Sequence, residues 1–308
     1  MVFSRNKGGT QTGVALIQAI VLSAVLSIIL LFLNTSAKKN VEAAQTLQDK
    51  NQALVDLYST EAQLLYDLFT NEHVSGEYAK GRWYFWGKPF NMDETAVVSI
   101  QDQAGLLNLH QLAERELIEL IERLGYDKAK AAEVAHSLID WQDSDNDTLP
   151  RGAERQAYQF GPRNKPMPEL SEINWLPQVP FELRETLQDY VTIFSPGYFN
   201  PANAPDKLLA ATLDVGKLSD PVKEFRLGRS STKDFKDVSQ LETDEGVYFF
   251  TSKHLAYKIA VTVGQSTMAK QMQVVIDPYS DSAQNTLKVL SINWGDKGLI
   301  NEKLEDNE

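Results

Sequence analysis

An acidic segment in the middle of the chain carries the residue types that bind a metal ion. It reads DWQDSDNDTLPRGAE, from Asp140 to Glu154, and holds five carboxylates in fifteen residues. Three of them alternate along the chain: Asp143, Asp145 and Asp147. Because a loop that folds around an ion can turn every second side chain inward, alternating oxygen ligands favour a hard cation of the size of calcium.

The segment can be numbered as an EF-hand loop that starts at Asp143. It departs from that pattern twice, since Thr148 stands where the sharp turn needs Gly, and Pro150 stiffens a stretch that normally curls. The pattern therefore favours a calcium loop that shares the spacing over a helix-loop-helix sensor. The candidate ligands are the carboxylates of Asp143, Asp145, Asp147 and Glu154, the backbone carbonyl of Leu149, and Asp140 just before the loop.

Whether such an ion would do chemistry depends on the groups beside it. A catalytic site needs a general base or a nucleophile near the metal. The four histidines are scattered, and none forms a metal-ligand pair at helical spacing. We therefore expect a structural Ca²⁺, with a loop that is loose without it because its carboxylates repel one another. A chelator or Asp145→Ala should then lower stability, and a solvated acidic turn without an ion is the alternative interpretation.

The composition narrows the remaining possibilities. The chain has 308 residues, enough to bury one sizeable core or two smaller ones. Its net charge of −12 argues against nucleic acid, because Lys and Arg drive phosphate binding. It has no Cys, so disulfides, thiolate nucleophiles and Cys-ligated zinc are excluded.

The N-terminus predicts a membrane segment. Val14 to Leu33 is a run of twenty residues without a charge, long enough at about 1.5 Å per residue to cross the hydrocarbon core of a bilayer. Arg5 and Lys7 precede it and favour a cytoplasmic N-terminus. A secretory signal cut after Ala37, a plain anchor and a leader cut just before the apolar run all compete. The run is too long for a signal peptide, whose apolar region has about 7–15 residues.

The helix should continue well beyond the membrane. No Gly or Pro occurs from Val14 to Ser75, so nothing interrupts a helix there. A stripe of apolar residues follows at helical spacing, which is typical of a helix with one packed face. The stripe consists of Leu47, Leu54, Tyr58, Ala62, Leu65 and Phe69.

The rest of the chain divides into strands and helices. RWYFWGKPF and TAVVSIQDQAG are rich in aromatic and β-branched residues and predict strands, as do GVYFFTS, AYKIAVTVG, AKQMQVVIDP and TLKVLSINW near the C-terminus. Helical periodicity dominates between them. The aromatic run in RWYFWGKPF should pack as core against the long helix, with an exposed binding face as the alternative.

The predicted fold class is α+β: a long N-terminal transmembrane helix packed on a small antiparallel sheet, with a large helical domain inserted between strands. Two domains in series are less consistent with the pattern, because RWYFWGKPF would leave few strands for a sheet of its own. The expected segments are a leader at 1–13, the helix at 14–75, sheet strands at 76–104 and 246–295, the helical domain at 105–245, and an acidic tail at 296–308.

The first residues also resemble a known family. TGVALIQAIVL is similar to a type IV prepilin N-terminus, with a short basic leader, a Gly and then an apolar helix. The resemblance implies that prepilin peptidase cuts after Gly13 and leaves Val14 as the new, methylated N-terminus. Most members carry Glu at the fifth mature position, where it pairs with the amine of a neighbouring subunit; here that position is Gln18. A neutral residue suits a subunit with no neighbour above it, because an unpaired charge in the bilayer is costly.

That departure is typical of the type II secretion minor pseudopilin called general secretion pathway protein K. Other stretches resemble the same family in the same order: VVSIQDQAGLLNLHQL, LIDWQDSD with GAERQAY, KPMPELSEI, and YFNPANAPDKLLAATL. The last has Ala202 and Ala204 where the family usually has Val or Leu and Thr. Family members bind calcium in this domain, which supports the loop at Asp143 to Glu154 as a Ca²⁺ site.

The resemblance implies a minor pseudopilin in the inner membrane of a Gram-negative cell, with its C-terminal bulk in the periplasm. Its expected partners are the minor pseudopilins I and J, with which it would cap the pseudopilus tip and help to initiate assembly, together with other pseudopilins and prepilin peptidase. No nucleic acid partner and no catalysis are expected. A minor pilin of a type IV pilus and a membrane-anchored periplasmic calcium-dependent enzyme are the alternatives.

Overall fold

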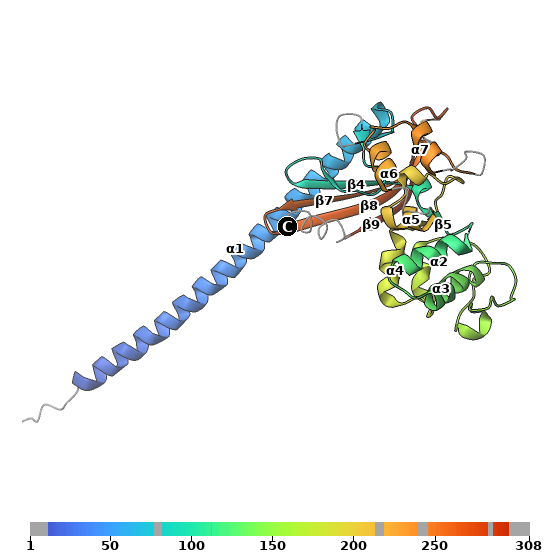
Figure 1. Cartoon of the computed structure of the whole chain (residues 1–308). Coiled ribbons are helices and arrows are strands. Elements are labelled where there is room, and N and C mark those ends of the chain that lie inside the picture. The colour runs from blue at the N-terminus through green and yellow to red at the C-terminus, as the bar shows by residue number, and fades with distance from the viewer. Residues whose placement is uncertain are drawn as a thin grey trace, which may run out of the picture.

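The computed structural model describes residues 12–76, 82–111, 113–212, 219–239, 246–282 and 286–295. The leader Met1–Gly13 lies outside these ranges except for its last two residues, and the tail at 296–308 lies wholly outside them. A single helix, α1 (Thr12–Thr70), runs from the start of the described chain into the globular part (Figure 1). By length and hydropathy it is the one described helix that could span a membrane.

The two halves of α1 have different surroundings. From Val14 to Gln52 no residue is buried, whereas the second half packs on a sheet. The buried stripe lies beside the predicted one and consists of Ala53, Leu57, Leu64 and Leu68. Leu47 and Tyr58, from the predicted stripe, are 61% and 50% exposed. The helix therefore has a second apolar face that is largely exposed in the described part of the chain.

The helix ends at Thr70, five residues before the predicted Ser75. Beyond it, β1 (Val74–Ser75) pairs in parallel with β2 (Arg82–Trp83). The His73 ring also bonds back to the carbonyl of Leu68, at 2.9 Å. The absence of Gly and Pro permits a helix but does not require one, and these contacts end it.

The central sheet is antiparallel, in the order β3 (Phe90–Asn91), β4 (Ala96–Asp102), β7 (His254–Val263), β8 (Ser266–Ile276) and β9 (Leu287–Trp294). Strands β4 and β7 are neighbours, although the helical part of the chain lies between them in sequence. The α+β fold with helices inserted between strands is thereby confirmed.

One face of the sheet packs on α1 and forms the first core. The strand residues facing the helix are apolar and alternate with polar ones, as expected for a sheet with one buried face. They include Val98, Ile100, Leu255, Tyr257, Ile259, Val261, Met272, Val274 and Ile276. The other face carries Ser99, Gln101, Lys258, Gln271 and Gln273, which line a cavity described below.

Two of the predicted strands are mostly irregular. RWYFWGKPF contributes β2, the start of β3 and an isolated bridge from Trp86 to Gln101. GVYFFTS contributes an isolated bridge from Val247 to Phe199. Gly87, with φ +81°, turns the first segment so that its amide donates to Ile100 at the edge of β4. Trp83 and Phe85 are buried beside α1, so the core interpretation of the aromatic run is confirmed for these two. In this segment the aromatic residues are buried, as predicted, but most of them do not lie in a strand.

The inserted helices build a second core. They are α2 (Glu114–Arg123), α3 (Lys128–Asp140), α4 (Phe181–Gln188), α5 (Asp206–Thr212), α6 (Ser219–Arg226) and α7 (Thr232–Ser239), with β5 (Leu107–Asn108) pairing in parallel with β6 (Val191–Thr192). Asp127 caps α3 by accepting from the amide of Lys130. Leu117, Ile121 and Leu138 are fully buried in this core.

A buried carboxylate ties the start and the end of the inserted region to the sheet. Asp102 is fully buried at the end of β4, and its oxygens accept from the amide of Ala104, from Asn203 Nδ2 at 2.9 Å and from Ser252 Oγ at 2.5 Å. Burial raises the pKa of Asp102, while the bonds from Ser252 and Asn203 act in the opposite direction. The hydrogen bonds of Asp102 therefore join the inserted helical region to the sheet.

Candidate metal centre

The acidic loop begins where α3 ends and brings three carboxylates together. Asp140 is the last residue of α3, and the chain then turns back so that Glu154 approaches it. One ligand oxygen from each of Asp140, Asp143 and Glu154 lies within 4.8 Å of the others. Asp140 and Glu154 are buried and Asp143 is half-buried. This spacing suits three oxygens around one hard cation.

Several of these oxygens have no partner in the protein. Both carboxylate oxygens of Glu154 and Oδ1 of Asp143 are buried without a hydrogen bond. An unpaired buried carboxylate is costly, because it loses its hydration and gains nothing in return. A cation held by Asp140, Asp143 and Glu154 would supply the missing interaction, so the residues present fit a calcium ion.

The electrostatics of the cluster are consistent with this. Burial and, next, the neighbouring carboxylates Asp145 and Asp140 raise the pKa of Asp143. Burial and then Asp140 raise the pKa of Glu154 in the same way. Burial also raises the pKa of Asp140, against the amide of Leu149, which donates to its two oxygens at 3.3 and 3.2 Å. The protein alone thus disfavours the charged state that a cation would stabilise.

The EF-hand numbering places the remaining candidates differently from the structure. Asp145 and Asp147 are exposed and stand outside the three-carboxylate cluster. Asp145 Oδ1 accepts from the amide of Asp147 at 2.8 Å, which forms a local turn. The carbonyl of Leu149 accepts from the amide of Gly152 at 2.9 Å. Asp140, which precedes the numbered loop, is instead a central member.

Other residues position the loop without joining the cluster. His136 Nε2 lies 2.9 Å from Glu114 Oε1, and its Nδ1 accepts from the amide of Arg151 at 3.3 Å, so the imidazole orients the returning strand of the loop. Trp141 donates to Glu172 at 3.1 Å, and Arg163 also bonds to Glu172. Glu172 and Arg163 were not among the predicted site residues, because nothing in their local spacing links them to the loop.

Gly152 allows the loop to close on Asp140. A Cβ at this position would lie 1.9 Å from Asp140 Oδ2, well inside contact distance. We expect Gly152→Ala to displace Asp140 and to abolish any stabilisation by calcium, measured as the change in melting temperature on adding Ca²⁺. Gly197→Ala is the control, since a Cβ there meets nothing and its cost is only the positive φ of +92°. An unchanged calcium response in Gly152→Ala would contradict this role.

The fold can be compared with solved structures. It combines a long apolar N-terminal helix, packed on a small antiparallel sheet, with helices inserted between neighbouring strands. The chain is similar in fold to GspK in the crystal structure of the GspK–GspI–GspJ complex from the type 2 secretion system of enterotoxigenic Escherichia coli. The TM-score is 0.55 and the identity 19%, over 83% of this chain and all of that one. No curated protein sequence matches the chain.

A family model matches the middle part of the chain. Residues 90–196 match the family model for type II secretion system protein K. The match starts in β3 and ends just after β6, so it includes both β4 and the carboxylate cluster. The part of the chain that this family model covers is therefore similar to protein K of the type II secretion system. The match names a secretion machine rather than a type IV pilus, which was the closest alternative.

Proposed function

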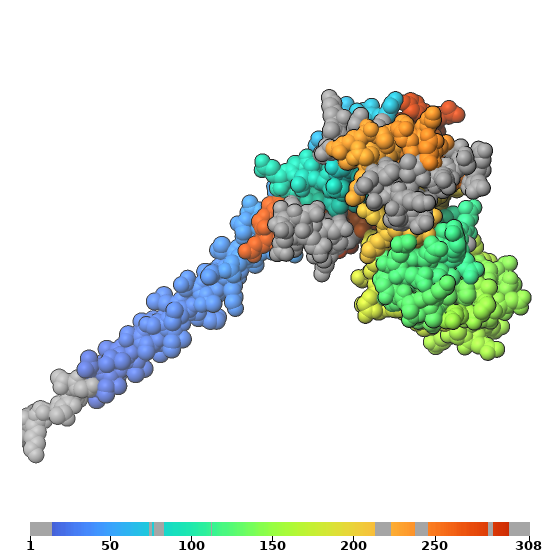
Figure 2. Space-filling view, in the orientation of Figure 1, coloured from blue at the N-terminus to red at the C-terminus, as the bar shows by residue number. Residues whose placement is uncertain are grey.

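We propose that the chain caps the tip of the pseudopilus, together with minor pseudopilins I and J. The observation that carries this is the position of the inserted helices. In Figures 1 and 2 the helical part stands beside the sheet, at the end of the molecule far from the apolar start of α1. Such a bulky addition would collide with a further subunit stacked above it. The GspK chain of similar fold was crystallised with GspI and GspJ, which supports these partners.

The uncovered face of α1 supports a place in a bundle of helices. Beyond the membrane segment, Leu47, Val55, Tyr58 and Tyr66 are 50–66% exposed. A row of large apolar side chains on a helix normally packs against another surface. We propose that helices of neighbouring pseudopilins cover this face, with Val14–Leu33 in the inner membrane and the globular part in the periplasm.

Processing at Gly13 is part of the same proposal. Prepilin peptidase would cut before Val14, which would then be methylated, and Gln18 would leave the subunit without the acidic partner that joins it to a subunit above. We expect Gly13→Ala to retain the leader and to reduce export across the outer membrane to background. N-terminal sequencing of the mature protein and an assay of secreted protein in the medium check both points.

Two results of this experiment would contradict the proposal. A wild-type N-terminus at Lys38 would show a conventional signal peptide cut after Ala37. Full export from cells in which Gly13→Ala keeps the leader attached would show that processing is not needed. Gly9→Ala, also within the leader but away from the cleavage point, is the matched control.

We propose a structural Ca²⁺ and no catalytic activity. Asp140, Asp143 and Glu154 would hold the ion, whose charge would offset the repulsion among these carboxylates and close the loop after α3. The nearby imidazole of His136 is already engaged by Glu114 and Arg151. The role of the family as a structural component of a secretion machine agrees with this.

A further inference from the structure

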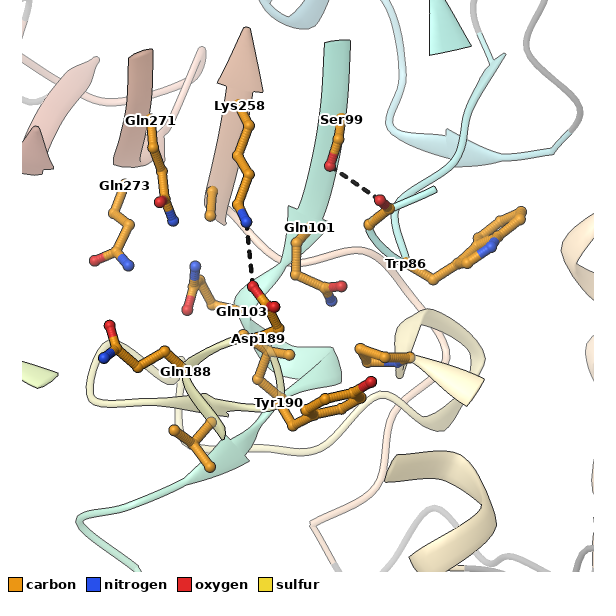
Figure 3. Close-up of a pocket in the computed structure, with 15 residues that line it drawn as sticks. Trp86, Ser99, Gln101, Gln103, Gln188, Asp189, Tyr190, Lys258, Gln271 and Gln273 are labelled. Carbon is orange, nitrogen blue, oxygen red and sulfur yellow. Dashed lines mark hydrogen bonds and ion pairs between the residues drawn. The ribbon is translucent and has the colours of Figure 1, made fainter. Parts of the chain in front are cut away.

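The two faces of the central sheet pack against different parts of the chain. On the face away from α1, polar side chains surround a cavity of about 210 Å³, which residues 188–191 of the inserted region close on the other side (Figure 3). There Lys258 Nζ bonds to Asp189 Oδ1 at 3.1 Å, and Gln103 Oε1 accepts from the hydroxyl of Thr192. The inserted region thus lies against the polar face, and α1 lies against the apolar one.

The apolar face extends one strand beyond the part that α1 covers. Met272 and Val274 of β8 are buried in the core between α1 and the sheet. Ile292 and Val289 lie opposite them on the edge strand β9, so their side chains point to the same side of the sheet. They are nevertheless 48% and 44% exposed, and Trp294 at the end of the strand is 50% exposed. Beyond β8, the apolar face is therefore largely open in the described part of the chain.

One residue of α1 continues this surface. The ring of Tyr58, which is 50% exposed, lies edge-to-face with that of Trp294 at 6.3 Å between centres. We call Tyr58, Val289, Ile292 and Trp294 the β9 patch. Adjacent exposed apolar side chains of this size indicate a contact with another segment of polypeptide. The patch borders the face of α1 that is proposed above to contact neighbouring pseudopilins, and Tyr58 belongs to both.

The strand that carries the patch is also open along its outer edge. β9 is the last strand in the order of the sheet, and none of the strands in the described ranges pairs with its outer side. An open edge presents unpaired backbone N–H and C=O groups and can pair with a further chain, so proteins usually cover or charge it. Among the eight residues of β9 only Lys288 is charged. The strand therefore offers a position for one more segment of chain.

The segment that follows β9 has a composition that fits this position. Residues 296–308 lie outside the described ranges, and their large apolar residues are Leu299, Ile300 and Leu304. They carry five acidic residues and two Lys, a net charge of −3, whereas β9 carries Lys288 and no acidic residue. Opposite charges attract two segments that lie side by side, by an amount that salt reduces. Hydrophobicity and charge thus both match this segment to β9.

We propose that residues 299–304 of the same chain cover the β9 patch, with Leu299, Ile300 and Leu304 in contact with it. A short tether gives a segment an effective concentration on the order of 1 mM at its site, which favours it over a separate chain. The contact would close the open edge of the sheet without a second subunit. The proposal does not depend on a place at the pseudopilus tip.

The geometry at the end of β9 permits this contact. The amide of Gly295 donates to the carbonyl of Ala269 at 2.9 Å, so the chain leaves the sheet directly beside Trp294. Gly295 has φ +88°, which suits the start of a turn. After a four-residue turn, a length found in many hairpins, residues 299–304 match in number the six residues from Trp294 back to Val289. The segment is therefore long enough to reach every strand residue of the patch.

Cysteine crosslinking shows which chain occupies the patch. The protein has no Cys, so a variant with Ile292→Cys and Ile300→Cys contains only these two thiols. In the full-length protein in detergent, we expect a short bismaleimide to join them within one chain. The control pairs Ile300→Cys with Gln111→Cys, at an exposed position in the inserted region, and should give less than a tenth of the intramolecular yield. A covalent dimer as the main product would assign the patch to a second copy and overturn the proposal, as would equal yields from the two variants.

Hydrogen exchange measures whether the segment protects the edge. A variant with Leu299→Ser and Leu304→Ser should exchange the amides of residues 287–294 at least tenfold faster than the wild type, because the outer edge of β9 is then open to water. Exchange in β7, which lies inside the sheet, should not change. Asn301→Ser, in the same segment but without loss of an apolar side chain, is the matched control. Wild-type exchange of residues 287–294 in the double variant would overturn the proposal, whereas the proposed role in secretion would still stand or fall on the Gly13→Ala result.

Discussion

Chelation of calcium should lower the melting temperature of the full-length protein by about 5–10 °C. A site held at a hundred times its dissociation constant contributes about 2.7 kcal/mol, and each kcal/mol moves the midpoint of a domain of this size by roughly 2–4 °C. The physical reason is that Glu154 and Asp143 present buried oxygens with no partner in the protein. Differential scanning calorimetry with EDTA and with 1 mM Ca²⁺, which is a hundred times a dissociation constant of about 10 μM, measures the difference.

Variants locate the ion within the loop. Glu154→Gln should abolish the calcium-dependent shift, because it removes a carboxylate from the cluster. Asp147→Ala and Asp145→Ala should keep most of it, since both side chains are exposed and outside the cluster. The spacing makes Asp145 a ligand, whereas the structure places its side chain outside the three-carboxylate cluster. A calcium response lost in Asp145→Ala and kept in Glu154→Gln would favour the EF-hand numbering instead.

The pH dependence offers an independent check. The cluster carboxyls have pKa values raised by burial and by one another, so the folded protein without calcium holds protons more tightly than the unfolded chain. Their favourable contribution is therefore fully present below the ordinary carboxyl pKa, about 4, and is lost as the pH rises through the raised values. In EDTA, the melting temperature should fall as the pH rises through this window, and Ca²⁺ should remove most of that fall. A Glu154→Gln variant should show a weaker dependence.

Replacing Lys270 by Met should destabilise the fold by about 3–5 kcal/mol, the usual cost of removing one partner of a buried ion pair. Lys270 Nζ lies 2.8 and 2.7 Å from the two oxygens of Glu61, and both residues are buried between α1 and β8. Tyr257 also donates to Glu61 at 2.8 Å. Without the ammonium group, the Glu61 carboxylate would remain buried with only one donor. Chemical denaturation followed by tryptophan fluorescence measures the loss.

The double variant shows whether the effect comes from the unpaired charge. Glu61→Met with Lys270→Met should recover most of the lost stability, because both charges are then gone and apolar groups fill the space. Lys288→Met, on the neighbouring strand and outside any ion pair given by the described residues, is the control for the substitution itself. If the double variant is as unstable as the sum of the single ones, the pair is not coupled.

The ammonium group of Lys270 has a further environment that the variant also removes. It lies 5.2 Å from the Tyr58 ring centre and 5.3 Å from that of Trp294, and these rings are 6.3 Å apart. Such contacts add roughly 0.5–2 kcal/mol. Lys270→Arg keeps the charge, so it should lower the free energy of unfolding less than Lys270→Met does.

Some of the fold followed directly from sequence patterns. The apolar run and the lack of Gly and Pro predicted α1, and aromatic and β-branched content predicted β7, β8 and β9 close to their observed bounds. The packed stripe of α1 was predicted only in part: Leu65 and Phe69 pack against the core, whereas Leu47 and Tyr58 are exposed. Leu47 is as apolar as the buried Leu57, and only tertiary contact distinguishes them. The strands predicted around Trp83 and Val247 are mostly irregular in the structure for a similar reason. Aromatic residues can be buried without forming a strand.

The candidate site was predicted in composition but not in arrangement. Spacing identified the acidic loop, but counting residues could not show that Asp145 bonds to the amide of Asp147 and turns outward. It also could not show that Asp140, on the preceding helix, replaces it beside Glu154. The Gln103–Thr192 and Glu61–Lys270 pairs join residues 89 and 209 positions apart, and no local pattern connects them.

The two halves of α1 have a mechanical consequence. The first contact that ties the helix to the sheet is at Thr46, whose carbonyl accepts from Ser266 Oγ at 3.4 Å, and the Glu61–Lys270 pair fixes it further along. From Leu33 to Thr46 the helix is exposed over about 20 Å, at about 1.5 Å per residue. This segment contains no Gly or Pro at which the helix could bend. We therefore expect a rotation of the apolar start of α1 about the helix axis to turn the globular part with it. Such a rotation would change the direction in which the inserted helices face.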